Sequence, residues 1–134
     1  MLKPRKLVHF TIPVKDLDRS EKFYTDMLGF QKVRRNEHMV FMRTGTDHFV
    51  LTKSHTPIDP NPGDDSAIHT AFLVDADHWD EAVSFLKSKG VKVIKEEDRR
   101  KGTFHGRSAY FHDPDRNVIE FIDLKNDPMQ DTGD

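Results

Sequence analysis

The feature that most constrains this chain is an internal repeat with an offset of 60 residues. The segment Val8–Val33 aligns with Ile68–Val93, so that His9 falls on His69. A sequence that repeats at this length encodes the same supersecondary unit twice. Because 134 residues amount to one domain of ordinary size, we expect two copies of that unit within a single domain spanning 1–134.

Each copy predicts a strand, a helix and then three strands. A first strand with alternating apolar residues is followed by a helical segment that a capping Asp begins and a Gly ends. The apolar rows are Val8, Phe10, Ile12 and Val14, then Ile68, Thr70, Phe72 and Val74; the helices begin at Asp18 and Asp77 and end at Gly29 and Gly90. Short strands follow at about 30–36, 38–44 and 48–53, and at about 91–96, 107–112 and 118–124.

These elements predict an α+β fold of two paired βαβββ modules that form a cupped, mostly antiparallel sheet. The modules span about 6–53 and 67–124. The segment 54–66 is rich in Pro and reads as a linker, and 125–134 reads as a polar tail.

Composition excludes several functions. The net charge of −2 leaves no basic excess for a phosphate backbone, so nucleic acid is not an expected partner. No apolar run approaches the ~20 residues of a membrane span, and the basic start lacks the apolar stretch of a secretory signal, so we expect a cytoplasmic protein without a membrane partner. The absence of Cys leaves imidazole, carboxylate, hydroxyl and amine chemistry, and it directs attention to the eight His.

The side chains opposite the apolar rows are expected to line the cup, because alternate residues of a strand point to opposite faces. A five-residue loop centred on Asp115 pairs Tyr110 with Glu120 across the last hairpin. The expected cup residues are His9, Thr11, His69, Ala71, Ser108, Tyr110, His112, Val118, Glu120 and Ile122.

Three of these residues suggest a metal site. His9 and His69 occupy equivalent positions of the repeat, and Glu120 points into the same cup. A buried carboxylate needs a partner, and a divalent cation would also use two neutral imidazoles. Two His and one carboxylate leave open coordination positions, which suits Fe(II) and also Mn(II). The alternative is that the three are unrelated strand residues, with Glu120 in a salt bridge and both His hydrogen-bonded.

The segments HFTIPVKDLDRSEKFYTDMLGF, IHTAFLVDADHWDEAVSFLKSKGV and AYFHDPDRNVIEF resemble the vicinal oxygen chelate superfamily, which includes glyoxalase I, extradiol dioxygenases, fosfomycin-resistance proteins and bleomycin-binding proteins. The resemblance covers roughly Lys6–Leu124 and implies His9, His69 and Glu120 as metal ligands. Glyoxalase I has a fourth ligand where this chain has Val50, so the glyoxalase I reaction is not expected. Such modules tend to pack together, which implies a homodimer.

The resemblance favours an extradiol-type, ring-cleaving dioxygenase that acts on a catechol. It implies Fe(II), with Mn(II) as the alternative, and a small-molecule substrate. His48 stands where that branch has an acid–base His, and Tyr110 would hydrogen-bond the chelated oxygen. Lys101 occupies the position of a second active-site His of that branch. We assign Thr11, Lys101 and Ser108 to substrate binding.

Two other activities stay open. Gly106-Arg107-Ser108 is similar to epoxide-hydrolysing fosfomycin-resistance proteins, Glu37 stands loosely where their general base falls, and the run 99–101 could hold a phosphonate. Against that branch, Ile122 stands where its members usually carry His. The remaining alternative is a metal-free protein that binds a drug or metabolite.

Overall fold

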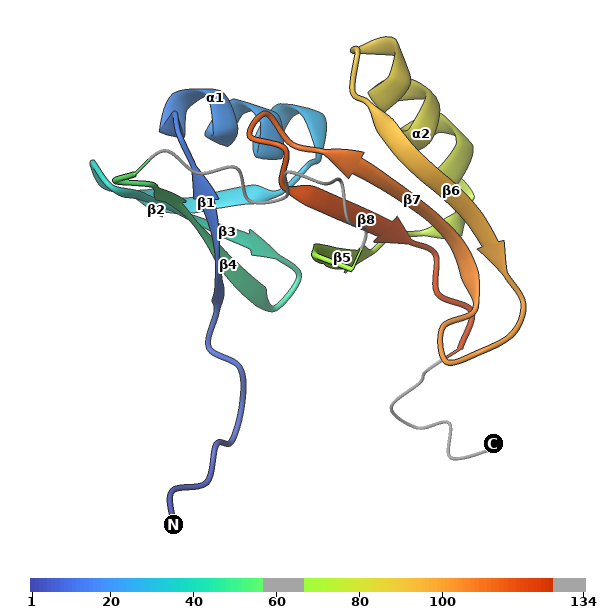
Figure 1. Cartoon of the computed structure of the whole chain (residues 1–134), viewed down its shortest axis with the longest axis horizontal. Helices are drawn as coiled ribbons and strands as arrows, with labels where there is room; N and C mark the ends of the chain where they lie inside the picture. The colour runs from blue at the N-terminus through green and yellow to red at the C-terminus, as the bar shows by residue number, and fades with distance from the viewer. Residues whose placement is uncertain (57–66, 127–134) are drawn as a thin grey trace. The chain divides into compact units, whose positions relative to one another are not determined.

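The computed structural model describes residues 1–56 and 67–126, and the chain divides into two compact units, Met1–Pro60 and Asn61–Asp134. Most of the expected linker 54–66 and tail 125–134 lies outside the described residues. The first unit contains β1 (Phe10–Val14), α1 (Leu17–Lys22), the π-helical turn η1 (Phe23–Met27), β2 (Gln31–Arg35), β3 (Met39–Thr44) and β4 (Asp47–Lys53) (Figure 1). The second unit contains β5 (His69–Leu73), the 3-10 turn η2 (Ala76–His78), α2 (Trp79–Ser88), β6 (Val93–Arg99), β7 (Gly106–His112) and β8 (Val118–Ile122).

Each unit has one four-stranded sheet, and the two sheets share their topology. The strand orders are β1-β4-β3-β2 and β5-β8-β7-β6, and in each sheet the first strand runs parallel to the last while the other pairs are antiparallel. The strands that follow the helices, β2 and β6, also carry a register shift each, between Lys32 and Arg34 and between Val93 and Lys95. The expected α+β fold of paired βαβββ modules is therefore confirmed.

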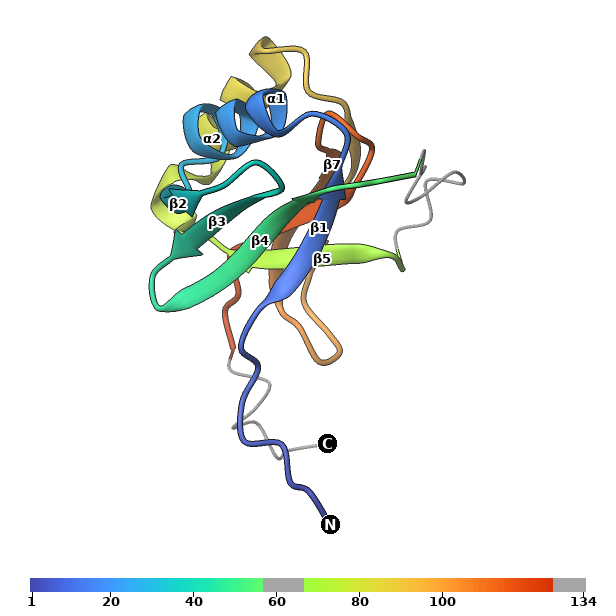
Figure 2. The same ribbon diagram turned by 90° about the vertical axis from the view of Figure 1, so that its left-hand side faces the viewer.

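An aromatic cluster forms the core of the first unit. Phe49 of β4 packs against Tyr24 and Phe30 with ring centroids 5.8 and 5.0 Å apart. Ile12 and Val14 of β1 are buried beside the helix, as the apolar row predicts. Figure 2 shows α1 lying over one face of this sheet. The opposite face is thus left to the other row of side chains on each strand.

Two helix starts differ from the prediction. Asp16, not Asp18, caps α1: its backbone is extended and its carboxylate accepts a hydrogen bond of 3.1 Å from the Arg19 amide. Asp77, the expected cap of α2, lies within the turn η2 instead. The residue directly before α2 is His78, and its side chain makes no capping hydrogen bond. Asp16 and Asp18 are both residue types that cap helices well, but the backbone conformation decides which of them caps α1.

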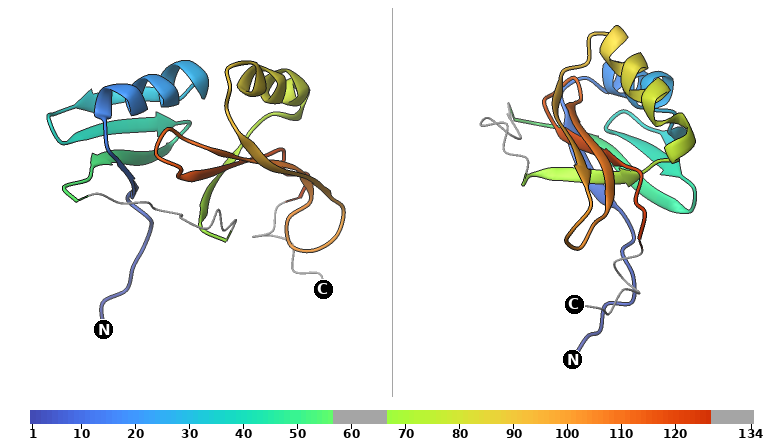
Figure 3. Two further views of the ribbon diagram at one scale, coloured as in Figure 1. Left: turned by 45° about the horizontal axis from the view of Figure 1, so that its top comes forward. Right: turned by 90° about the vertical axis from the view of Figure 1, so that its right-hand side faces the viewer.

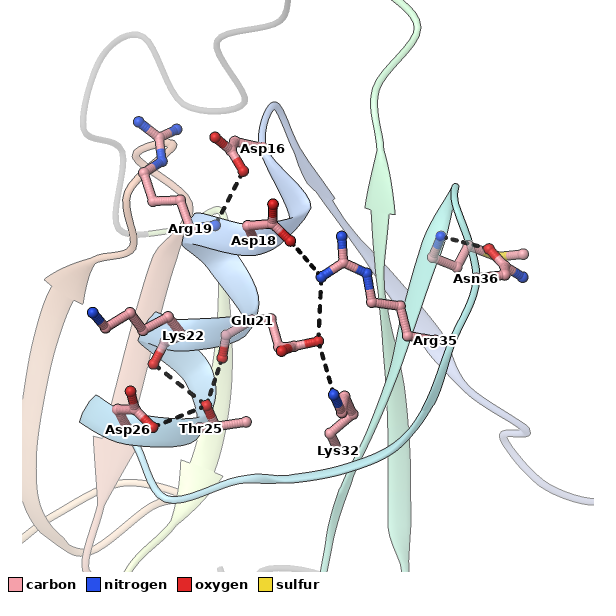
Figure 4. Close-up of polar contacts among 11 residues, drawn as sticks. Asp16, Asp18, Arg19, Glu21, Lys22, Thr25, Asp26, Lys32, Arg35 and Asn36 are labelled. Carbon is pink, nitrogen blue, oxygen red and sulfur yellow. Dashed lines mark hydrogen bonds and ion pairs between the residues drawn. The ribbon is translucent and has the colours of Figure 1, made fainter.

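Asp18 instead joins a polar network that links α1 to β2 (Figure 4). Arg35 lies 2.7 Å from the Asp18 carboxylate and 3.4 Å from that of Glu21, which also lies 3.4 Å from the Lys32 ammonium. The hydrogen bond with Asp18 raises the pKa of Arg35. Since Asp18 is exposed, the network orients the helix more than it stabilises the unit.

The first strands are shorter than predicted. β1 begins at Phe10, which leaves Val8 71% exposed, and β5 begins at His69, which leaves Ile68 55% exposed. The ladder with the last strand does not extend to these two residues, so the apolar row packs only from Phe10 onward in the first copy. Both predicted helix ends are confirmed, because Gly29 and Gly90 have φ angles of 78° and 79°. Among the described residues no helix has the length and apolar character needed to cross a membrane.

In the second unit, α2 packs on one sheet face through buried Trp79, Val83 and Leu86 (Figure 3, right). Arg107 of β7 belongs to this face: its guanidinium lies 5.3 Å from the Trp79 ring and 2.9 Å from the Asp123 carboxylate. Burial alone would raise the pKa of Asp123, but hydrogen bonds from the side chain and backbone of Arg107, together with the Lys125 charge, lower it.

Candidate functional site

A buried carboxylate lies at the centre of the helix-free face of the second sheet. Glu120 is in the middle of β8, and its side chain is 5% exposed. One oxygen, Oε1, lies 3.0 Å from Nε2 of His69, and the other, Oε2, accepts a hydrogen bond of 2.8 Å from the Ser108 hydroxyl. Both oxygens therefore have partners, as a buried carboxylate requires. Three predicted site residues from three strands are thus brought together.

The strand register explains this arrangement. Glu120 pairs with Ala71 of parallel β5 and with Tyr110 of antiparallel β7, so the predicted Tyr110–Glu120 pair is confirmed. The small side chain of Ala71 leaves space for His69, two residues earlier on the same face, to reach the carboxylate. Tyr110 is buried, and its ring meets the His69 ring edge to face with centroids 5.2 Å apart.

A row of alternating charges on β6 borders this site. Lys95, Glu97 and Arg99 are two residues apart and share the face of Tyr110. The Glu97 carboxylate lies 2.7 Å from the Lys95 ammonium and accepts a hydrogen bond of 2.6 Å from Nε of Arg99. Nη2 of Arg99 in turn donates a hydrogen bond of 2.7 Å to the Tyr110 hydroxyl. Hydrogen bonds from Lys95 and Arg99 lower the pKa of Glu97. Burial raises the pKa of Tyr110, the Glu120 charge adds to this, and Arg99 opposes it.

The spacing of His69 and Glu120 fits a divalent ion. Two ligand atoms that each lie ~2.1 Å from one ion at a right angle are about 3.0 Å apart. The observed 3.0 Å between His69 Nε2 and Glu120 Oε1 equals this separation, and it is also the distance of a hydrogen-bonded pair, the alternative given above. Over residues 1–56 and 67–126, no group of three His, Asp or Glu converges to hold a metal. His9 is an exposed residue of the first unit, just before β1, so its part in the ligand set stays a prediction.

The other predicted residues do not join this cluster within the second unit. Lys101 is exposed in the loop after β6, and Arg107 lies on the helix-covered face, so Ser108 alone represents the fosfomycin-type Gly-Arg-Ser motif here. Thr11 and His48 are exposed residues of the first unit, on β1 and β4, and their predicted roles stay predictions.

The first unit repeats the strand pairing around Glu120, but it has no carboxylate at the equivalent position. Val50 pairs with Thr11 as Glu120 pairs with Ala71, so the equivalence of Val50 and Glu120 is confirmed. The neighbour of Val50 on β3 is Phe41, which is the counterpart of Tyr110 in the second unit. Val50 is buried and offers no metal ligand.

Sequence reasoning missed most of the β6 row. It considered Arg99 only within the run 99–101 and did not use Lys95 or Glu97. The available signal was the alternation Lys-x-Glu-x-Arg at period 2. The strand was predicted to end at about 96, whereas β6 runs to Arg99, so Glu97 and Arg99 fell outside the predicted strand.

Comparison with known proteins identifies the family. Residues 6–121 match the Glyoxalase/Bleomycin resistance protein/Dioxygenase superfamily. The chain belongs to this superfamily. It is 28% identical over 116 residues to the fosfomycin resistance protein FosX of Listeria innocua, covering 85% of this chain and 86% of the relative. It is 30% identical over 131 residues to a lactoylglutathione lyase of Neisseria meningitidis, covering 90% and 92%.

A third relative in the superfamily is biphenyl-2,3-diol 1,2-dioxygenase 3 of Rhodococcus globerulus, 29% identical over 136 residues, covering 95% of this chain and 68% of the relative. Among solved structures, a mutant of FosX from Listeria monocytogenes, complexed with Mn(II) and 1S,2S-dihydroxypropylphosphonic acid, matches with a TM-score of 0.73 and 23% identity, covering 90% and 91%. The relatives carry the names of three different activities, so membership alone does not select one.

Proposed function

We propose that the chain is a divalent-metal-dependent enzyme that binds a small substrate through two neighbouring oxygens. His9, His69 and Glu120 would hold the metal. The observation that carries this proposal is the buried Glu120 carboxylate, which the strand register brings to within 3.0 Å of the His69 imidazole on the helix-free face. The related FosX structure contains Mn(II), which supports the choice of a divalent ion. When bound, the ion would polarise a substrate oxygen as a Lewis acid.

Opening of an epoxide ring in a small phosphonate is the activity that the geometry supports best. Ser108, the serine of the Gly106-Arg107-Ser108 sequence that is similar to epoxide-hydrolysing members of the superfamily, hydrogen-bonds to Glu120 at 2.8 Å. The ligand in the related FosX structure is a dihydroxypropyl phosphonate, the kind of vicinal diol that water addition to an epoxide yields. Glu37, exposed beside β3, would serve as the general base.

Extradiol cleavage of a catechol is the second candidate. The favouring observation is Tyr110, which pairs with Glu120 in the register and lies against His69, where it could hydrogen-bond a chelated catechol oxygen. The similarity to a biphenyl-diol dioxygenase also supports it. In this reaction Fe(II) would be the metal, His48 would move protons, and Lys101 would contact substrate.

One experiment separates these activities. Metal-free protein is loaded anaerobically with Mn(II) or Fe(II), and its metal content is measured by elemental analysis. The Mn(II) form is then given fosfomycin and followed by ³¹P NMR, and the Fe(II) form is given dioxygen and a catechol panel and followed by the absorbance of the ring-opened product. We expect one metal per chain and turnover of the phosphonate. Stoichiometric metal without turnover in either assay overturns both activities, and binding of no metal overturns the enzyme proposal in favour of a metal-free binder.

The proposed enzyme would act as a homodimer. Sedimentation equilibrium of the metal-loaded chain is expected to give twice the 15.6 kDa chain mass, and a monomer at micromolar concentration would contradict this.

A further inference from the structure

The Tyr110 hydroxyl has its hydrogen-bonding direction restricted by Arg99. Nη2 of Arg99 donates to the hydroxyl oxygen at 2.7 Å. A guanidinium has donors only and stays protonated, so it cannot accept the phenolic proton. The single O–H of Tyr110 must therefore point away from Arg99. Glu120 lies directly across the β7–β8 ladder from Tyr110.

Arg99 is itself held in place from behind. Its Nε donates to Oε2 of Glu97 at 2.6 Å, while the Lys95 ammonium holds Oε1 of Glu97 at 2.7 Å. Arg99 pairs with Gly106, which has no side chain, so the arginine can extend along the sheet face toward Tyr110. The Arg99 side chain is 32% exposed, so it is partly shielded from water. Two hydrogen bonds at different nitrogens therefore define its position.

We infer that Arg99, braced by Glu97 and Lys95, is a positioning residue that keeps the Tyr110 hydroxyl as a hydrogen-bond donor directed toward the His69–Glu120 pair. This inference rests on the proposed function in one respect, that a substrate oxygen lies beside that pair. Such an oxygen meets a fixed donor, so the site favours an ether, epoxide or deprotonated oxygen over a hydroxyl that must donate. No proton is transferred in this step; only a hydrogen bond forms.

The first test needs neither metal nor substrate. The chain has two tyrosines, so ¹³Cζ labelling of tyrosine gives two NMR signals, and Tyr110→Phe identifies one of them. We expect Arg99→Gln and Arg99→Lys to shift the Tyr110 signal, because Lys cannot bridge Glu97 and the hydroxyl. Arg100→Gln is the matched control, since Arg100 is 85% exposed and pairs with Asp98 instead. An unshifted Tyr110 signal in folded Arg99→Gln protein overturns the inference.

The second test uses whichever assay of the proposed function shows turnover. Arg99→Gln is expected to lower kcat about 10-fold, within the range for residues that support a site from behind, while metal content stays unchanged. In a Tyr110→Phe background the same change is expected to have no further effect, because Arg99 acts through the hydroxyl.

Direct binding of a phosphonate by Arg99 predicts different effects on KM and kcat. If the guanidinium only supplied charge to a phosphonate, Arg99→Gln would raise KM, Arg99→Lys would keep most activity, and the loss would persist in Tyr110→Phe protein. That pattern overturns positioning. Absence of turnover in the wild type rejects the proposed function but leaves the NMR test decisive for the Arg99–Tyr110 contact.

Discussion

Removal of the Glu120 charge tests the metal site most directly. Glu120→Gln keeps the size of the side chain and an oxygen for Ser108, but it removes the only negative charge among the three proposed ligands. Loss of a residue that merely supports a ligand costs 10–100-fold in metal affinity. Ser108→Ala, which removes the 2.8 Å hydrogen bond to Oε2, should fall in that range, or about 1.4–2.8 kcal/mol. Glu120→Gln should therefore exceed 100-fold.

The assay is a competitive chelator titration with Mn(II), with circular dichroism to establish that the variants are folded. Folding of Glu120→Gln is expected to be close to wild type, because a neutral amide is cheaper to bury than a carboxylate. Glu96→Gln is the charge-matched control, since Glu96 on β6 pairs with Lys87 at 2.9 Å and is half exposed. A Glu120→Gln affinity within twofold of this control refutes the assignment of Glu120 as a ligand.

Three further outcomes are expected. Val50→Glu places a carboxylate at the repeat counterpart of Glu120, the proposed metal ligand, so Mn(II) affinity should rise and any dioxygen-dependent rate should fall; unchanged affinity in folded protein contradicts this. Asp123→Asn should lower the free energy of unfolding by about 1–3 kcal/mol at neutral pH in urea titrations. Because folding lowers the pKa of Asp123 below its ordinary value, its contribution is fully present above the unfolded pKa and is lost as the pH falls through the folded pKa, so wild type and variant should converge in acid. His48→Gln should slow ring cleavage 10²–10⁴-fold with full metal content, whereas Glu37→Gln should be the damaging change for epoxide opening.

The fold was predictable because its repeat and its strand alternation are both periodic. The pair Tyr110–Glu120 followed from the length of one loop, and the register confirms it. Helix caps were less predictable: Asp16 and Asp18 are equally suitable by residue type, and only the extended backbone at Asp16 distinguishes them. Strand ends failed for a similar reason, because Val8 has the right residue type but no ladder partner.

The site was predictable only in part. A carboxylate in an apolar strand is conspicuous, which is why Glu120 was identified. Charged residues on a strand usually indicate a solvated edge, so Lys95, Glu97 and Arg99 gave no functional signal individually. Their role depends on side-chain reach across the sheet, since Arg99 pairs with Gly106 but bonds to Tyr110. Strand register alone does not determine such diagonal contacts.

Comparison of the two units explains why one half of the repeat carries a carboxylate and the other does not. The helix-covered faces must both be largely apolar, because each buries its own helix, and this requirement preserves the repeat there. The opposite faces only need to keep the same register. In that register Val50, Phe41 and Arg34 of the first unit correspond to Glu120, Tyr110 and Lys95 of the second, and both cations lie over the aromatic ring, at 5.9 and 5.7 Å. The scaffold thus constrains where a side chain sits and leaves its chemistry free to differ, so at these three positions only the second unit carries a carboxylate and a phenol.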